Sequence, residues 1–101
     1  VGAVNPPDVE PSIMHAPACY SRRGPGLRIG LKPDLAHIGG SGSLHSRFGT
    51  GLFSITPNGN ISDGCGTSYA APIVAKTLSS LDHSIEGATS RETLMALAIH
   101  H

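Results

Sequence analysis

The sequence predicts an α/β chain in which several short strands precede two helices. Short apolar stretches, separated by turns rich in glycine and proline, fill the part of the chain before residue 51, which is typical of strands joined by loops. The tetrapeptide Pro57-Asn58-Gly59-Asn60 is the strongest signal for a β-hairpin. From residue 68 onward, the spacing of apolar residues changes to one that is typical of helices.

Three short extended pieces are predicted before residue 40. Val1-Gly2-Ala3-Val4 is small and apolar, as expected for the end of a buried strand. Residues 18–20 and residues 32–38 are the other two candidates. The prolines within residues 5–17 favour a loop, and residues 21–26 favour a turn. In the hairpin that follows, alternation over residues 51–56 predicts the first strand, and residues 60–62 provide a brief return strand.

Two helices are predicted after the hairpin. The first covers residues 68–81 and is apolar on nearly every side, so we expect it to be buried in a larger body. Pro72 lies early enough in this helix to be tolerated. Gly87 marks a break, and Thr89-Ser90-Arg91-Glu92 predicts a capping box with Thr89 as the N-cap of the second helix.

Composition excludes several classes of partner. The 101 residues, enough for one small domain, include 7 Lys plus Arg and 7 Asp plus Glu, so the formal net charge is zero. No basic field is present to hold a nucleic acid or an anionic membrane surface. Apolar stretches are only a few residues long, far short of a bilayer span. We therefore expect neither a nucleic acid nor a membrane as a partner.

The segment Gly66-Thr67-Ser68-Tyr69-Ala70-Ala71-Pro72 carries the main chemical signal. It places a serine between a glycine-bearing turn and a helix start, where unpaired backbone N–H groups and the positive end of the helix dipole are available. A serine hydroxyl becomes a useful nucleophile when a base takes its proton and donors hold the resulting oxyanion. The Ser68 N–H is a natural oxyanion donor. The alternative is that Ser68 only caps the helix.

Four segments, in order, resemble those of the subtilisin-like (subtilase) serine peptidases. They are Val1-Gly2-Ala3-Val4, Tyr20-Ser21-Arg22-Arg23-Gly24-Pro25, Lys32-Pro33-Asp34-Leu35 with Gly39, and Gly66 to Pro72 with Val74-Ala75. The resemblance implies that residues 1–101 are an incomplete, C-terminal portion of a subtilase domain. It implies a parallel-sheet remnant, a hairpin, a central helix that carries the nucleophile, and a following helix. The sequence departs from the family at Tyr69, which replaces Met, at His37-Ile38, which replaces Ala-Pro, and at Lys76, which replaces Gly.

The resemblance also implies a function and a set of site residues. Ser68 corresponds to the nucleophile of a serine endopeptidase, its backbone N–H to an oxyanion-hole donor, and Gly66 and Thr67 to the support of the nucleophile turn. The implied substrate is a polypeptide that is cleaved through an acyl-enzyme, and no cofactor or metal is implied. In the family the order along the chain is Asp, His, Ser. The Asp, the His and the oxyanion Asn are therefore expected upstream of Val1, in cis or on another chain, and the isolated chain is expected to be inactive.

Other interpretations remain open at this point. The chain can instead be a catalytically inactive fragment or a degenerate homologue with a structural or binding role. A hydrolase of the Gly-x-Ser-x-Gly type is excluded because Ala70 stands where the second glycine belongs. A metal site at His37 and His45 lacks a recognised spacing and a third ligand. Cys19 and Cys65 either form one bridge or stay as two buried, reduced thiols.

Overall fold

The computed structural model describes residues 1–7, 13–22, 24, 26, 30, 32–42 and 50–100. Strands come first and helices last within these residues, so the α/β prediction is confirmed at this coarse level. The elements are β1 (Gly2–Val4), β2 (Ala36–Ile38), β3 (Leu52–Ile55), β4 (Ile61–Gly64), α1 (Thr67–Ser84) and α2 (Arg91–His100). Three residues named above lie outside the described residues: Arg23, Pro25 and His45.

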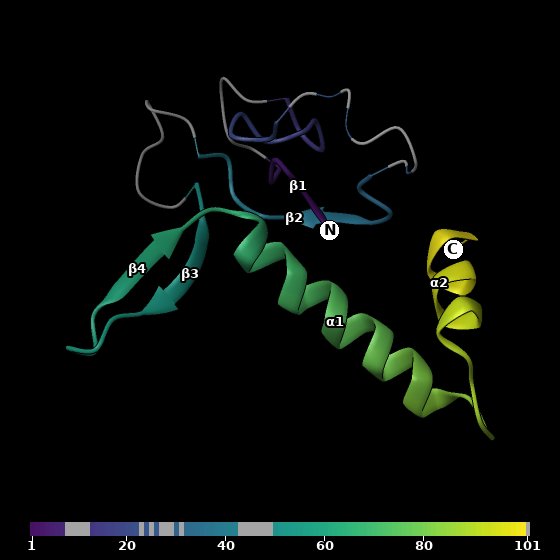
Figure 1. Cartoon of the computed structure of the whole chain (residues 1–101). Helices are drawn as coiled ribbons and strands as arrows, with labels where there is room; N and C mark the ends of the chain where they lie inside the picture. The colour runs from purple at the N-terminus through teal and green to yellow at the C-terminus, as the bar shows by residue number, and fades with distance from the viewer. Residues whose placement is uncertain are drawn as a thin grey trace.

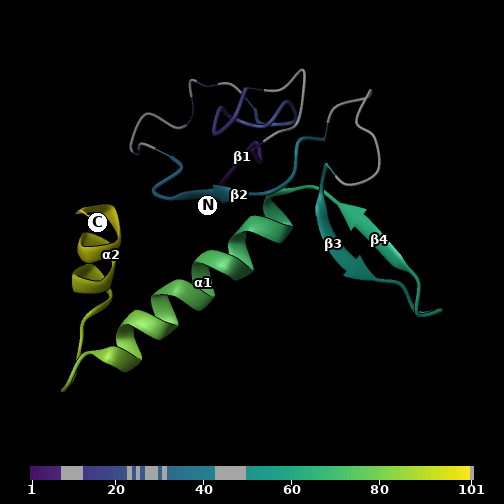
Figure 2. The same cartoon turned by 180° about the vertical axis from the view of Figure 1, so that it is seen from behind.

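The two N-terminal strands form a small parallel sheet that lies against α1. Gly2 pairs with Ala36 and Val4 pairs with Ile38. The extended piece predicted over residues 32–38 is thus a strand only in its last three residues. Figure 1 shows α1 running below this sheet, with the hairpin of β3 and β4 at one end of the helix and α2 at the other. The same arrangement is seen from behind in Figure 2.

The strand predicted at residues 18–20 is wrong, because these residues form a turn. The Ser21 N–H donates to the Ala18 carbonyl at 2.8 Å, which closes the turn. The segment contacts β1 around one isolated antiparallel bridge between Val4 and Pro17. The Ala18 N–H donates to the Ala3 carbonyl at 3.0 Å, and the chain turns away directly after it.

The predicted hairpin is confirmed, and its second strand is longer than expected. Strands β3 and β4 pair antiparallel from Ile55 opposite Ile61 to Leu52 opposite Gly64. Residues 56–60 form the loop, which is closed by a hydrogen bond from the Thr56 N–H to the Asn60 carbonyl at 2.8 Å. Gly59 has a positive φ of 79°, as a tight loop of this kind requires.

The first helix is confirmed, but little of it is buried. It spans Thr67–Ser84 with Pro72 in its second turn, and only Ala70 and Val74 are buried. Ile73, Leu78 and Leu81 are half-buried, so the apolar surface predicted to lie inside a larger body is only partly covered by the described residues. Several large apolar side chains on other elements are exposed as well, namely Phe53, Ile55, Ile61, Leu97 and Ile99.

The second helix is confirmed, but its predicted cap is displaced by one residue. Ser90, rather than Thr89, caps the helix, since its Oγ accepts a hydrogen bond from the Thr93 N–H at 3.2 Å. The Leu94 N–H donates to the Ser90 carbonyl, also at 3.2 Å. Thr89 Oγ1 is buried, and no described residue forms a hydrogen bond with it. A serine and a threonine both suit this position, so the pattern alone did not fix which one would be used.

The small core joins the start of α1 to the sheet. Its buried members are Ala3 from β1, Ala18 from the turn and Ala70 from α1, and Tyr20 packs against them. Alanines bury little apolar area, but they allow the three backbone segments to approach closely. The core thus stabilises the fold at the point where the helix begins.

Replacing Ala70 with leucine is expected to destabilise the fold by about 1–3 kcal/mol, because Ala70 is fully buried and the larger side chain overpacks the contact. The neighbouring Ala71 is exposed, so Ala71→Leu is the matched control and should change stability by less than about 0.5 kcal/mol. Chemical denaturation followed by circular dichroism measures both. Equal effects of the two substitutions would contradict the assigned core.

Candidate functional site

Ser68 is the second residue of α1 and is exposed. The first N–H groups of a helix have no partner one turn earlier. Here the Gly66 carbonyl accepts from the N–H groups of Tyr69 at 3.0 Å and Ala70 at 3.4 Å. Among the described residues, none accepts a hydrogen bond from the Ser68 N–H, and none forms one with its hydroxyl. The hydroxyl and the N–H are thus both open to a ligand.

The alternative in which Ser68 caps the helix is wrong. The N-cap is Gly66, which makes no side-chain hydrogen bond, and Ser68 already has a helical position. Gly66 has φ 149° and ψ 163°, a region that essentially only glycine adopts. This conformation turns the chain from strand β4 into the helix within a few residues. Thr67, the first helical residue, is exposed beside the serine.

The turn before the helix is tied to residues far away in the sequence. The Gly66 N–H donates to the Gly39 carbonyl at 2.8 Å. The Tyr20 hydroxyl donates to the same carbonyl at 2.8 Å and approaches the Gly40 carbonyl at 3.0 Å. A side-chain carbon on Gly39 would lie 2.6 Å from Ala3 Cβ, so the backbone passes very close to β1. One residue from each of the four segments that carry the sequence resemblance therefore lies at or next to this turn, namely Ala3, Tyr20, Gly39 and Gly66.

Tyr69 joins the hairpin to the helix on the other side of the turn. A side-chain carbon on Gly64 would overlap the Tyr69 hydroxyl, so the ring lies directly against the end of β4. Tyr69 occupies one of the positions where the sequence departs from the family. The larger residue is accommodated because Gly64 presents only backbone to it.

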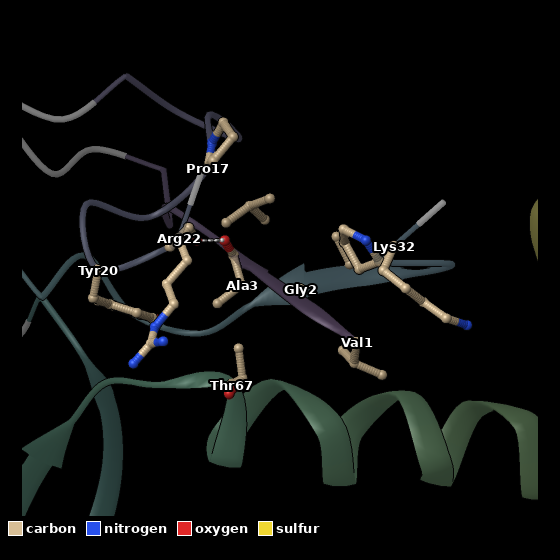
Figure 3. Close-up of a pocket in the computed structure, with 12 residues that line it drawn as sticks. Val1, Gly2, Ala3, Pro17, Tyr20, Arg22, Lys32 and Thr67 are labelled. Atoms are coloured by element: carbon tan, nitrogen blue, oxygen red, sulfur yellow. Dashed lines mark hydrogen bonds between the residues drawn. The ribbon is translucent and has the colours of Figure 1, made fainter. Parts of the chain in front are cut away.

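A cleft of about 610 Å³ opens beside the first residue of α1 (Figure 3). Its walls come from β1, the turn at residues 17–22 and the segment at residues 32–36. Thr67 reaches its edge, whereas Ser68 is not one of its lining residues. Lys32 and Asp34, both exposed, form an ion pair beside the cleft. A hydrogen bond from Lys32 lowers the pKa of Asp34 below its ordinary value.

Histidine and cysteine side chains form no metal site within the described part of the chain, where no three residues of the His, Cys, Asp and Glu types cluster. His37 lies in β2, and its ring contacts the carbonyl of the adjacent Ile38 at 3.4 Å. His100 is in the last turn of α2, where a cation suits the helix dipole. Cys19 and Cys65 are both free and exposed, so neither the bridge nor the pair of buried thiols predicted as alternatives is present.

Tyr20 supports the helix start in a way that local sequence patterns do not predict. Tyr20 was part of a matched segment, but nothing in the pattern indicated that its hydroxyl reaches the carbonyls of Gly39 and Gly40. Burial is the largest of the causes that raise the pKa of Tyr20 above its ordinary value of 10.0. Negative charge on Cys65 and on Cys19 also raises this pKa, whereas the Gly66 N–H lowers it. The phenol is therefore protonated, and able to donate, at neutral pH.

Comparison with models of protein families, with curated proteins and with solved structures found no match to this chain. Among the described residues, neither helix combines the length and the apolar character that crossing a bilayer requires.

Replacing Gly66 with alanine is expected to destabilise the fold by about 1–3 kcal/mol because of its backbone conformation. Space is not the reason, since an added carbon would lie 3.8 Å from its nearest neighbour, Ser68 N. Gly26 is the control, because an added carbon there meets nothing within 4 Å and its φ is not positive. Thermal denaturation of Gly66→Ala and Gly26→Ala should separate the two effects, and a neutral Gly66→Ala would contradict the turn geometry.

The raised pKa of Tyr20 predicts a loss of stability at alkaline pH. As the pH rises past 10, the unfolded chain releases this proton first, while the folded state still holds it, so the free energy of unfolding falls. Tyr20→Phe removes this contribution. The melting temperature of the original chain should therefore drop toward that of Tyr20→Phe between about pH 9 and pH 11. A constant difference over this range would contradict the assignment.

Proposed function

We propose that this chain carries the nucleophile of a subtilisin-like serine endopeptidase. The observation that supports the proposal best is the state of Ser68, whose hydroxyl and N–H are both open at the start of a helix. Ala3, Tyr20 and Gly39, one residue from each of the other matched segments, lie close to that helix start. A serine whose only role is structural would more often use its hydroxyl for a cap or a backbone contact.

The proposed reaction is acyl transfer to Ser68. Its Oγ attacks the carbonyl of a peptide bond while a histidine takes the proton, and the histidine then returns that proton to the leaving amine. The Ser68 N–H, together with an asparagine side chain, holds the oxyanion, and the positive end of the α1 dipole favours the same charge. Water then releases the acyl group and restores the hydroxyl. Gly66 and Thr67 set the position of the serine through the turn.

The histidine, its aspartate and the asparagine are proposed to come from polypeptide upstream of Val1 or from another chain. Removing a general base costs roughly 10²–10⁴ in rate. Removing one oxyanion donor costs about a further 10²–10³. Residues 1–101 alone should therefore show essentially no peptidase activity, and polypeptide substrate should be cleaved only by the completed domain.

The second candidate is an inactive fragment or degenerate homologue that acts as a binding or structural piece. It is favoured by the exposed apolar side chains of the hairpin, Phe53, Ile55 and Ile61, which are 66%, 77% and 67% exposed. Such a surface is typical of an interface with another body. A completed peptidase domain would cover the same side chains, so the reactivity of Ser68 decides between the two candidates.

Labelling with a fluorophosphonate probe separates the candidates. The chain joined to the polypeptide encoded directly upstream should be labelled on Ser68 and should cleave an unfolded protein substrate. Ser68→Ala should abolish both, whereas Ser80→Ala, which removes an exposed hydroxyl elsewhere on α1, should change neither. Mass spectrometry locates the adduct. If the extended protein is neither labelled nor active, the nucleophile assignment is wrong and the binding role is favoured.

A further inference from the structure

We propose that the Tyr20 hydroxyl is a positioning group for the nucleophile turn. Tyr20 lies outside the sequence segment that contains Ser68. Within the described part of the chain, its hydroxyl is hydrogen-bonded to the carbonyls of Gly39 and Gly40 and not to the serine. It acts through the Gly39 carbonyl and Gly66. This inference rests on the proposed function and adds to it a residue that governs how precisely Ser68 is held.

The contacts form a short chain of hydrogen bonds. The Gly39 carbonyl accepts from the Tyr20 hydroxyl and from the Gly66 N–H, each at 2.8 Å. The carbonyl is thus held from two sides, and the second donor belongs to the N-cap residue of α1. Two peptide bonds separate Gly66 from Ser68, so a shift of the Gly66 plane is passed directly to the N–H and hydroxyl of the serine.

The turn needs an external hold because Gly66 has no side chain to fix it. Glycine gains access to its φ of 149° at no steric cost, but it is also the residue with most freedom to leave that conformation. Within the described part of the chain, the Gly39 carbonyl is the backbone acceptor of the Gly66 N–H. The position of that carbonyl therefore limits the range of conformations open to the turn.

The Tyr20 ring is itself fixed, which makes the hydroxyl a rigid anchor. It packs against the buried alanines of the core. A side-chain carbon on Gly42 would overlap Tyr20 Cδ1, so the backbone of residues 39–42 wraps closely around the ring. Phenylalanine at this position keeps the ring contacts and loses only the hydroxyl. Tyr20→Phe therefore tests the hydrogen bonds separately from the packing.

Small displacements of a nucleophile lower the rate far more than they lower affinity. In the extended protein, Tyr20→Phe should reduce the maximal rate constant of fluorophosphonate labelling by about tenfold, with the probe concentration at half-maximal rate unchanged. Hydrogen–deuterium exchange at the amides of Gly66 and Ser68 should become faster. A purely structural role would lower the melting temperature without moving the maximal rate constant at temperatures where the protein stays folded.

Thr77→Val is the matched control. Thr77 Oγ1 donates to the Ile73 carbonyl at 3.1 Å on the same helix, so this change also removes one hydroxyl-to-carbonyl hydrogen bond. It should leave the labelling rate and the exchange at Gly66 unchanged. Equal labelling rates in Tyr20→Phe and the original protein would overturn the inference while leaving the nucleophile assignment intact. If the original protein is not labelled at all, the proposed function is wrong. In that case hydrogen–deuterium exchange alone tests the positioning role, which is overturned if exchange at the Gly66 amide is unchanged in Tyr20→Phe.

Discussion

The hydrogen bond between the Gly66 N–H and the Gly39 carbonyl is the interaction on which the described structure depends most. It fastens the entry of α1 to the loop that follows β2, and through β2 to β1. It is accompanied by the alanine contacts of the core, which bury little area, and by a hydrogen bond from the Ser41 N–H to the Thr50 carbonyl at 3.0 Å. The direction of α1, and with it the placement of Ser68, follows from this one junction.

The core around the junction is small by necessity. Alanine at positions 3, 18 and 70 lets three backbone segments come together where a larger side chain would keep them apart. The consequence is a limited apolar area for stabilisation, while the hairpin and α2 keep large apolar side chains exposed. Exposed apolar side chains of this size are typical of surfaces at which another body packs.

Local signals were enough to predict the elements that depend on neighbouring residues. The turn at Asn58-Gly59 predicted the hairpin, and the change in apolar spacing predicted α1, because turn and helix propensities act over a few residues. Contacts between distant segments were not predictable in the same way. Residues 18–20 were predicted as a strand, yet a turn closed by the Ser21 N–H and the Ala18 carbonyl takes the chain away from β1 after one bridge. The cap of α2 was displaced by one residue because Thr89 and Ser90 compete for the same role.

The candidate site shows the same difference between local signals and contacts between distant segments. The exposed serine at a helix start follows from seven consecutive residues, and for that reason the sequence identified it. Its support comes from Tyr20 and Gly39, which reach the turn only after the chain has folded. Glycine can adopt the backbone conformation of the turn but has no side chain to fix it. The position of the turn therefore depends on groups elsewhere in the fold. How precisely a nucleophile is positioned at such a helix start therefore depends on the folded arrangement. A local motif indicates where chemistry can occur but does not determine its rate.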